Sequence, residues 1–198
     1  MEKITLGEEN IESIGLLSEP NFFRIHCYLD LEGADFAKTI SCKRDGHYDF
    51  SELHSKNHLF AMSSHPHWTL VPTTIFKEED AAGYLKLNTG FTGNTPFAYS
   101  SLDGLESVLI YERDEEAEKF ANQIQPALET KHLEGTLLEY GRRKTSETKG
   151  DLLQIQVLDQ LAIINIFKQG SLLLANSIEV TKAEDLIYYI FYTLKKLD

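Results

Sequence analysis

Four histidines form the densest group of side chains in this sequence that could do chemistry. They lie within 14 consecutive positions, at His54, His58, His65 and His67. Two histidines four residues apart share one face of a helix, and zinc ligands often have this spacing. Ser55 follows His54, however, so the HExxH signature of zinc proteases is absent. We interpret the four as surface or half-buried histidines and predict no metal site, with a histidine-based metal hydrolase as a remote alternative.

The other motifs give little support for catalysis. No GxSxG sequence is present, so no serine occupies the exposed turn where such hydrolases hold their nucleophile. The loop at 88–96 contains Gly90 and Gly93, but a phosphate-binding Walker loop would continue with lysine, and Asn94 follows Gly93 instead. We interpret this loop as a flexible connection, with a binding loop as the alternative. The sequence therefore predicts no catalytic residue.

Charge and composition narrow the choice of partners. The 198 residues carry 19 basic and 31 acidic side chains, a formal net charge of −12. Nucleic acid and anionic membranes attract basic surfaces, so neither is an expected partner. The N-terminal residues lack the pattern of a signal peptide, and apolar runs such as 161–167 are too short to cross a membrane. We expect a cytoplasmic protein without membrane insertion, in which Cys27 and Cys42 are buried free thiols.

Strand and helix patterns alternate along the chain, which predicts an α/β fold with helices packed on a mixed or parallel sheet. The first half is expected to begin with a hairpin of strands at 22–30 and 34–42, followed by a helix at 49–60. A further helix is marked by Asp114, which can cap its start, and by Pro126, which stops it.

Residues 145–150, TSETKG, are typical of a linker, and the pattern changes after them. Strands are predicted at 151–158, 161–168 and 171–180, followed by a helix at 182–197. A three-stranded sheet with a single helix leaves one face of the sheet uncovered. Exposed apolar sheet surface usually marks an interface, so this part of the chain predicts a protein partner or self-association.

Three segments resemble a known bacterial family. Residues 68–88 contain a strand ending in Val-Pro, then an apolar residue before Phe, acidic residues and Tyr-Leu. Residues 107–124 continue with a strand and a helix, and residues 172–197 contain an Asn, Thr, Glu, Asp and Tyr-Tyr pattern. Over about residues 20–198 the chain is similar to the domain-of-unknown-function family 3822.

This resemblance implies a fold similar to that of the actin-like ATPases, which have two RNase H-like lobes. Residues 1–144 would form the N-terminal lobe and residues 145–150 the linker. Residues 151–198, with three strands and a helix, would form an apparently incomplete second lobe. Active relatives bind phosphate at two hairpin turns, one in each lobe, where an Asp is followed closely by Gly because backbone amides must approach the phosphates.

The resemblance places the residues that would bind a nucleotide at Asp30, Gly33 and Asp159. In the first turn Glu32 lies before Gly33 and adds a negative charge where phosphate would sit. In the second turn no glycine follows Asp159 before Gly170. These departures argue against ATP binding, and we predict no cofactor.

The resemblance therefore favours a non-catalytic protein of the actin-like ATPase fold that binds other proteins. The pilus-assembly branch of that superfamily supplies cytoplasmic scaffolds, so an adaptor of this kind fits by analogy of fold. We expect a protein partner, which the sequence does not identify, with a homo-oligomer as a further option. The alternative is a nucleotide-binding ATPase that uses Asp30 and Asp159 around a metal ion.

Overall fold

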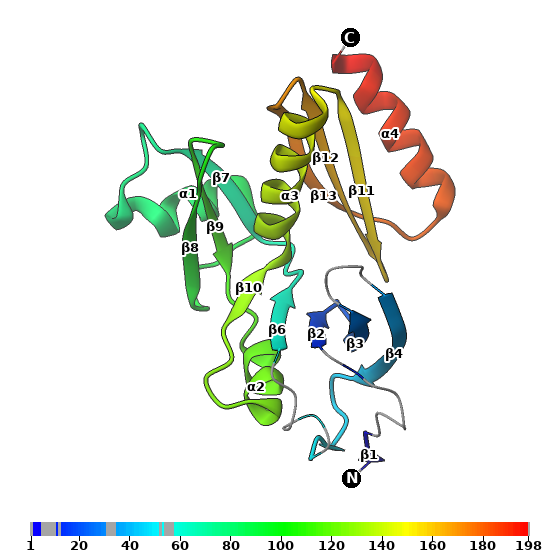
Figure 1. Ribbon diagram of the computed structural model, residues 1–198. Coiled ribbons are helices and arrows are strands. Elements are labelled where there is room, and N and C mark those ends of the chain that lie inside the picture. The colour runs from blue at the N-terminus through cyan, green and yellow to red at the C-terminus, as the bar shows by residue number, and fades with distance from the viewer. Residues whose placement is uncertain are drawn as a thin grey trace. The chain divides into compact units, whose positions relative to one another are not determined.

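The computed structural model describes residues 2–4, 11, 13–30, 35–51, 53 and 58–197 (Figure 1). The chain divides into two compact units. Unit 1 comprises Met1–His65 and Arg113–Leu133, and unit 2 comprises Pro66–Glu112 and Glu134–Asp198. Each unit has its own sheets and its own buried core.

Unit 1 is built on a five-stranded sheet. An antiparallel meander forms one side of it, with β2 at Ser13–Ser18, β3 at Phe22–Asp30 and β4 at Asp35–Lys43. Strand β6 at His58–Ser63 runs parallel to β2, and β10 at Thr130–His132 runs parallel to β6. The strand order is β10-β6-β2-β3-β4, which places β2 at the centre.

Helix α2, at Glu115–Ile124, covers the core of this sheet. The ring of Phe120 on α2 stacks on that of Phe23 on β3, with 4.1 Å between the ring centroids. Cys27 and Cys42 are buried free thiols in the same core, as predicted. The buried residues of α2 are Ala117, Phe120, Ala121 and Ile124, which lie on one face of the helix.

The central strand β2 was not expected from the sequence, which gave 22–30 as the first strand. All six residues of β2 are buried, so it has no alternation of apolar and polar residues to mark it as a strand. Gly15 adds to the difficulty, because glycine is rare in strands. The structure explains why residue 15 is a glycine, because the ring of Phe60 occupies the place where a Cβ at this position would lie.

The prediction of a helix at 49–60 is wrong at both ends of this range, where the structure has strands. Tyr48–Asp49 forms strand β5, which pairs in parallel with β1 at Glu2–Lys3, and β6 already begins at His58. Phe50 and Leu53 have helical spacing in the sequence, but a hydrogen bond from the Leu53 N–H to the Phe50 carbonyl closes a turn between them. Both side chains are buried in the core of unit 1.

Unit 2 contains two three-stranded antiparallel sheets. The first has the order β7-β9-β8, with β7 at Trp68–Pro72, β9 at Ser107–Glu112 and β8 at Phe97–Leu102. A short 3-10 turn at Glu78–Asp80 leads into α1 at Ala81–Asn88, which packs on this sheet. The buried residues between them are Val71, Ala81, Leu85, Phe91, Val108 and Ile110.

The second sheet of unit 2 has the order β11-β12-β13 and lies close to its predicted positions. Its strands are β11 at Leu152–Leu158, β12 at Leu161–Lys168 and β13 at Ser171–Glu179. Helix α3 at Leu133–Thr148 precedes it, and α4 at Ala183–Leu197 follows it (Figure 1). The three strands and the helix predicted after residue 150 are therefore confirmed.

The two helices pack on opposite faces of this sheet, so the expectation that one whole face is uncovered is wrong. On one face, Phe167 of β12 packs against α3 so closely at Gly141 that no Cβ would fit there. On the other face, Asn176 of β13 donates a hydrogen bond to the hydroxyl of Tyr189 on α4. Asn176 pairs with Ile164 of β12, three positions from Phe167, and side chains three positions apart in a strand point to opposite faces.

The predicted linker at 145–150 overlaps the end of α3. Its residues 145–148 belong to this helix, which ends at Thr148. The chain also passes between the two compact units at positions other than the predicted linker, because residues 66–112 belong to the same unit as the C-terminal part of the chain. The division into lobes at 1–144 and 151–198 stays a prediction.

Candidate functional site

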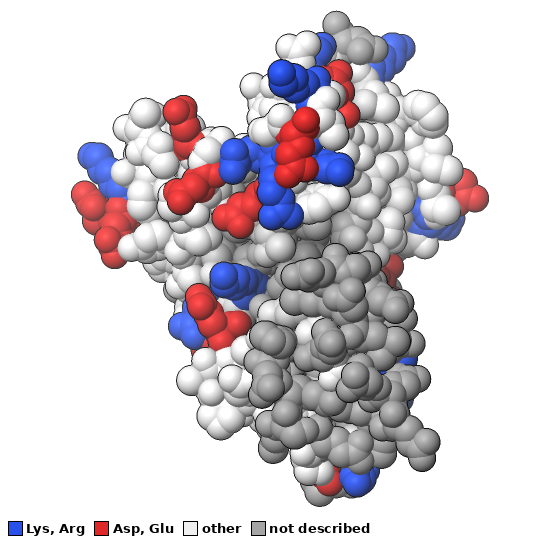
Figure 2. Space-filling model, in the orientation of Figure 1, with Lys and Arg blue, Asp and Glu red and all other residues white. Residues whose placement is uncertain are grey.

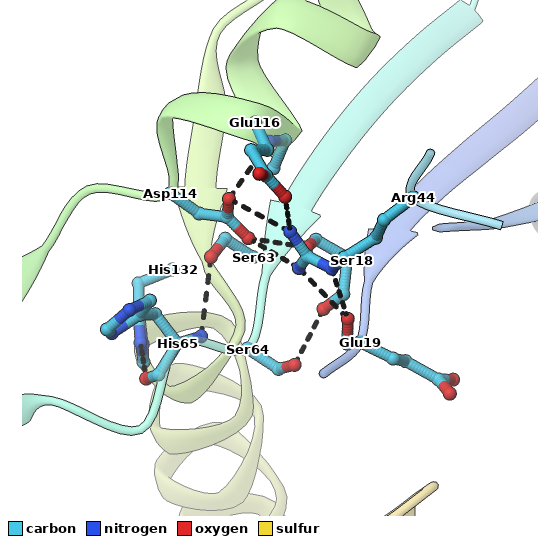
Figure 3. Close-up of polar contacts among 10 residues, drawn as sticks. Ser18, Glu19, Arg44, Ser63, Ser64, His65, Asp114, Glu116 and His132 are labelled. Atoms are coloured by element: carbon cyan, nitrogen blue, oxygen red, sulfur yellow. Dashed lines mark hydrogen bonds and ion pairs between the residues drawn. The ribbon is translucent and has the colours of Figure 1, made fainter. Parts of the chain in front are cut away.

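Arg44 is the centre of a polar cluster in unit 1 (Figure 3). It follows β4, and its guanidinium reaches the turn between β2 and β3. Nη2 donates hydrogen bonds to Ser18 Oγ at 2.5 Å and to the Glu19 carbonyl at 2.9 Å, and Nε donates to the same carbonyl at 3.1 Å. Nη2 also contacts Asp114 Oδ2 at 2.9 Å, and Nη1 contacts Glu116 Oε2 at 2.8 Å. Every nitrogen of the guanidinium is thus engaged by protein acceptors.

Asp114 connects this cluster to the start of α2. Its Oδ1 accepts the backbone N–H of Ala117 at 3.0 Å, which makes Asp114 the helix cap that the sequence predicts, and its Oδ2 accepts the hydroxyl of Ser18 at 2.6 Å. Burial acts to raise the pKa of Asp114. The hydrogen bonds from Arg44, Ser18 and Ala117, together with the charge of Arg44, outweigh burial and hold the pKa below its ordinary value. The carboxylate is therefore ionised at neutral pH.

Further contacts fix the turn at residues 19–21. The carboxylate of Glu19 accepts a hydrogen bond from Arg24 Nε at 2.7 Å. The N–H and the hydroxyl of Ser64 donate to the Ser18 carbonyl at 3.1 and 2.6 Å. The turn contains no glycine, although a phosphate-binding turn needs glycine for the close approach of its amides. This geometry suits a structural lock between β2, β4 and α2.

Of the three residues predicted for nucleotide binding, Asp30 belongs to unit 1 and Asp159 belongs to unit 2. Asp30 is the last residue of β3, in unit 1, and its backbone pairs with that of Asp35. Gly33 lies outside the described residues. Asp159 is exposed in the turn between β11 and β12 of unit 2, with a φ of 29°. A role of these residues in binding nucleotide stays an untested alternative.

The strand β2 changes which turn of unit 1 corresponds to the Asp159 turn of unit 2. Each meander begins with a hairpin, and the turn of the first hairpin is at 19–21 in unit 1 and at 159–160 in unit 2. The sequence interpretation used the later turn at 30–33 because it did not detect β2. A sequence signal for the earlier turn does exist, since Pro20 follows a short apolar run.

The four histidines are only partly described. His54 and the side chain of His58 lie outside the described residues. The carbonyl of His65 accepts a hydrogen bond from Nε2 of His132 at 2.8 Å. Burial lowers the pKa of His132 to about 4, although that hydrogen bond acts to raise it, so this imidazole is neutral at pH 7. The metal-hydrolase alternative stays untested, and His132 was not among the residues it considered.

Unit 2 contains a cavity of about 680 Å³ beside β7 and β13. His67 lies at its wall, and its Nδ1 is 2.6 Å from Oε2 of Glu112. The indole N–H of Trp68 donates to Ser177 Oγ at 2.9 Å and fixes the ring in the same wall. The loop at 88–96 contributes its first three residues to the lining, so the loop considered for binding does border a cavity.

Unit 2 also carries most of the exposed apolar surface of the described chain. Nine of the thirteen exposed large apolar side chains lie in β11, β13 and α4. These nine are Leu153, Ile155, Val157, Leu173, Ile187, Tyr188, Phe191, Tyr192 and Leu197. Contiguous apolar surface of this kind is unusual on a monomeric protein. Across the described residues, no helix is both long enough and apolar enough to cross a membrane.

Two solved structures share this arrangement of strands and helices. A protein of Bacteroides thetaiotaomicron with an actin-like ATPase fold and unknown function matches with a TM-score of 0.73 and 22% identity, over 98% of this chain and 80% of that chain. A chain of the PilM-PilN type IV pilus biogenesis complex matches with a TM-score of 0.52 and 11% identity, over 94% and 66%. The chain therefore has a mixed α/β actin-like fold, as predicted. No curated protein matches the sequence.

A family defined by its sequence pattern also matches. The family described as "Protein of unknown function (DUF3822)" covers residues 59–198, which is more than half of the chain. The match includes the three segments at 68–88, 107–124 and 172–197 on which the resemblance was based. The chain belongs to the DUF3822 family of proteins of unknown function.

Proposed function

We propose that this chain is a protein-binding scaffold, and that an extended segment of its partner adds to the edge of β11 in unit 2. Edge strands present unpaired backbone N–H and C=O groups, which form a template for a further strand. In the described part of the chain β11 pairs with β12 on one side and has no strand on the other. This open edge is the observation that carries the proposal.

The sequence of β11 supports a role in pairing. Proteins usually protect edge strands with charges or proline, yet LLQIQVL contains neither over its seven residues. Two of the other edge strands carry such protection, whereas the edge strand β8 at Phe97–Leu102 does not. Strand β4 carries Lys38 and Lys43, and β7 ends at Pro72. The unprotected edge of β11 is consistent with selection for a partner.

The face of β11 on the side of α4 is suited to the same partner. Leu153, Ile155 and Val157 alternate along the strand and are 39%, 38% and 53% exposed. Their counterparts on β12 are buried, so the cover that protects the middle of the sheet does not extend to β11. A partner segment with alternating apolar side chains would cover these three residues and form backbone hydrogen bonds at the edge.

The polar cluster of unit 1 supports a function that does not need ATP. Arg44 already donates to protein acceptors from every guanidinium nitrogen, and the turn at 19–21 lacks glycine. The chain of the PilM-PilN complex has the same fold and occurs in an assembly with another protein. Protein binding is thus compatible with this fold.

The test is capture of a partner by the tagged full chain from its source cell, followed by binding of the purified partner to three proteins. These are the wild type, Val157→Lys on β11 and the control Leu87→Lys on α1, where Leu87 is 83% exposed. We expect the wild type and the control to bind equally, with or without Mg-ATP, and Val157→Lys to bind at least about tenfold more weakly. Equal binding by Val157→Lys would overturn the proposal.

Thermal unfolding with Mg-ATP tests the alternative of a nucleotide-binding ATPase. A ligand at 100 times its dissociation constant stabilises a protein by about 2.7 kcal/mol, which raises the melting temperature measurably. We expect no shift at millimolar Mg-ATP. A shift that Asp159→Asn abolishes would favour the ATPase alternative over the scaffold.

A further inference from the structure

Helix α4 has two apolar sides, and the sheet uses only one of them. The less exposed side includes Tyr189, whose hydroxyl accepts the hydrogen bond from Asn176 of β13. The members of this side are Leu186, Tyr189, Ile190, Thr193 and Leu194. The other side consists of Ile187, Tyr188, Phe191 and Tyr192, which are 53%, 71%, 69% and 50% exposed. At about 100° per residue, the two sets are centred on opposite sides of the helix.

The exposed side, which we call the outer stripe of α4 (Ile187, Tyr188, Phe191 and Tyr192), is rich in aromatic rings that contact their neighbours. The rings of Tyr188 and Tyr192 stack with 6.1 Å between their centroids. The Lys196 ammonium lies 5.7 Å from the centroid of the Tyr192 ring. Figure 2 shows the visible surface over α4 as uncharged along its length, with charged side chains at its two ends. A ring-rich stripe of this kind is typical of the centre of an interface.

The charges at the ends of α4 show which partner fits the stripe. Its first turn carries Glu184 and Asp185, and its last turn carries Lys195 and Lys196. By helical geometry Glu184 and Lys195 lie on the same side as the outer stripe, one at each end of it, about 16 Å apart. A partner helix should therefore be basic at one end, acidic at the other and apolar between them.

A second copy of α4 in antiparallel orientation meets this description. Glu184 and Lys195 are symmetric about the midpoint of segment 184–195, and so are Tyr188 and Phe191. A two-fold axis through that midpoint brings Glu184 of one copy to Lys195 of the other, and Tyr188 to Phe191. A parallel pair would instead place like charges together at both ends, which is unfavourable.

We propose that the outer stripe of α4 is a homodimer interface, in which α4 pairs antiparallel with α4 of a second copy of this chain. The same surface is used by both copies, as two-fold symmetry requires. The apolar stripe supplies the affinity, and the charged ends set the orientation. The inference is independent of the proposed function, because the outer stripe and the edge of β11 are different surfaces.

Sedimentation velocity of the full chain tests the dimer, over loading concentrations from about 1 μM to about 1 mM. We expect the wild type to shift with concentration toward twice the 22.5 kDa mass of the chain. Phe191→Lys is expected to remain a monomer at concentrations where the wild type is a dimer. Leu87→Lys and Val157→Lys lie outside the outer stripe and are expected to dimerise normally. A wild type that stays monomeric throughout would overturn the proposal.

Charge reversal tests the antiparallel register. Glu184→Lys alone, or Lys195→Glu alone, would place like charges at both ends of the dimer, and we expect each to self-associate on the order of tenfold more weakly. An equimolar mixture of the two variants restores opposite charges at both ends, and we expect it to associate as tightly as the wild type. Because the mixture uses the same two proteins, recovery also shows that both are folded. Failure of the mixture to recover, or wild-type association of each variant alone, would overturn the register.

Discussion

The meander of unit 1 and the meander of unit 2 have the same antiparallel order but different neighbours. In unit 1 the first strand, β2, lies between β3 and β6, and all six of its residues are buried. In unit 2 the first strand, β11, pairs only with β12 in the described chain, and its side chains alternate between half-buried and exposed. In unit 1 the parallel strand β6 pairs with the first strand of the meander and places it inside the sheet. In unit 2 the first strand has no such neighbour in the described chain and lies at the edge of its sheet. The surface open to a partner is thus set by what joins the meander.

Matched truncations in the two first strands would measure this difference. Ile14 on β2 is fully buried, whereas Ile155 on β11 is 38% exposed. We expect Ile14→Ala to lower the free energy of unfolding of unit 1 by about 4 kcal/mol, and Ile155→Ala to lower that of unit 2 by about 1 kcal/mol or less. The chain contains its own probes, because its single Trp lies in unit 2 and both cysteines lie in unit 1. Denaturant titrations followed by Trp fluorescence and by thiol reactivity therefore report the two units separately.

The opposite result would remove the contrast. If Ile155→Ala cost as much as Ile14→Ala, β11 would be as enclosed as β2, and its edge would be closed to a partner. Leu87→Ala on α1 is the control for an exposed apolar residue and should leave both titrations unchanged.

The sequence predicts unit 2 better than unit 1 for a physical reason. Helix α4 and the strands of the second sheet of unit 2 follow regular periods, and the structure places them close to the expected ranges. Strand β2 is enclosed on both faces and contains Gly15, so its residue pattern carries no period of two. The burial that makes β2 the centre of the sheet is thus also what hides it in the sequence.

The polar cluster of unit 1 could not be predicted from residue spacing. Its capping residue, Asp114, is visible in the sequence because it begins an amphipathic helix. Its cation, Arg44, lies 70 positions earlier, and only the fold brings the two together. The turn at 19–21 was missed along with β2. Local signals identify such residues one by one, whereas long-range pairing decides which of them meet.

Glu134 and His132, two positions apart, should give the two units opposite responses to pH. Glu134 belongs to unit 2, and burial raises its pKa from 4.5 to about 8. A raised pKa stabilises the fold fully below 4.5, and this stability is lost as the pH rises to about 8. We expect unit 2 to lose on the order of 3 kcal/mol across this range by Trp68 fluorescence. Glu134→Gln should remove the loss, whereas Glu139→Gln, at an exposed position of the same helix, should retain it.

His132 belongs to unit 1, and burial lowers its pKa from 6.5 to about 4. Its stabilising effect is complete above 6.5 and is lost as the pH falls toward 4. We expect unit 1 to lose roughly 2 kcal/mol over this range, measured by the reactivity of its cysteines with a disulfide reagent that reacts in acid. His132→Gln should flatten the profile, and His47→Gln, at an exposed position, should not. Identical pH profiles for both units would contradict the assignment of these two groups to separate cores.

Arg44→Met should produce a smaller loss than either pH effect, and it should decide what the polar cluster of unit 1 is for. Methionine keeps an apolar stem near the ring of Phe23, over which the guanidinium lies at 4.7 Å, but it leaves Asp114 without its cation. We expect a loss of about 1.5 kcal/mol in the thiol titration of unit 1, no change in the Trp signal of unit 2, and no change for the exposed control Arg143→Met. A structural lock requires this loss to appear in the absence of any ligand. If Arg44→Met left stability intact and instead changed a response to Mg-ATP, the cluster would be a phosphate site, and unit 1 would have kept the function that its turn at 19–21 argues against.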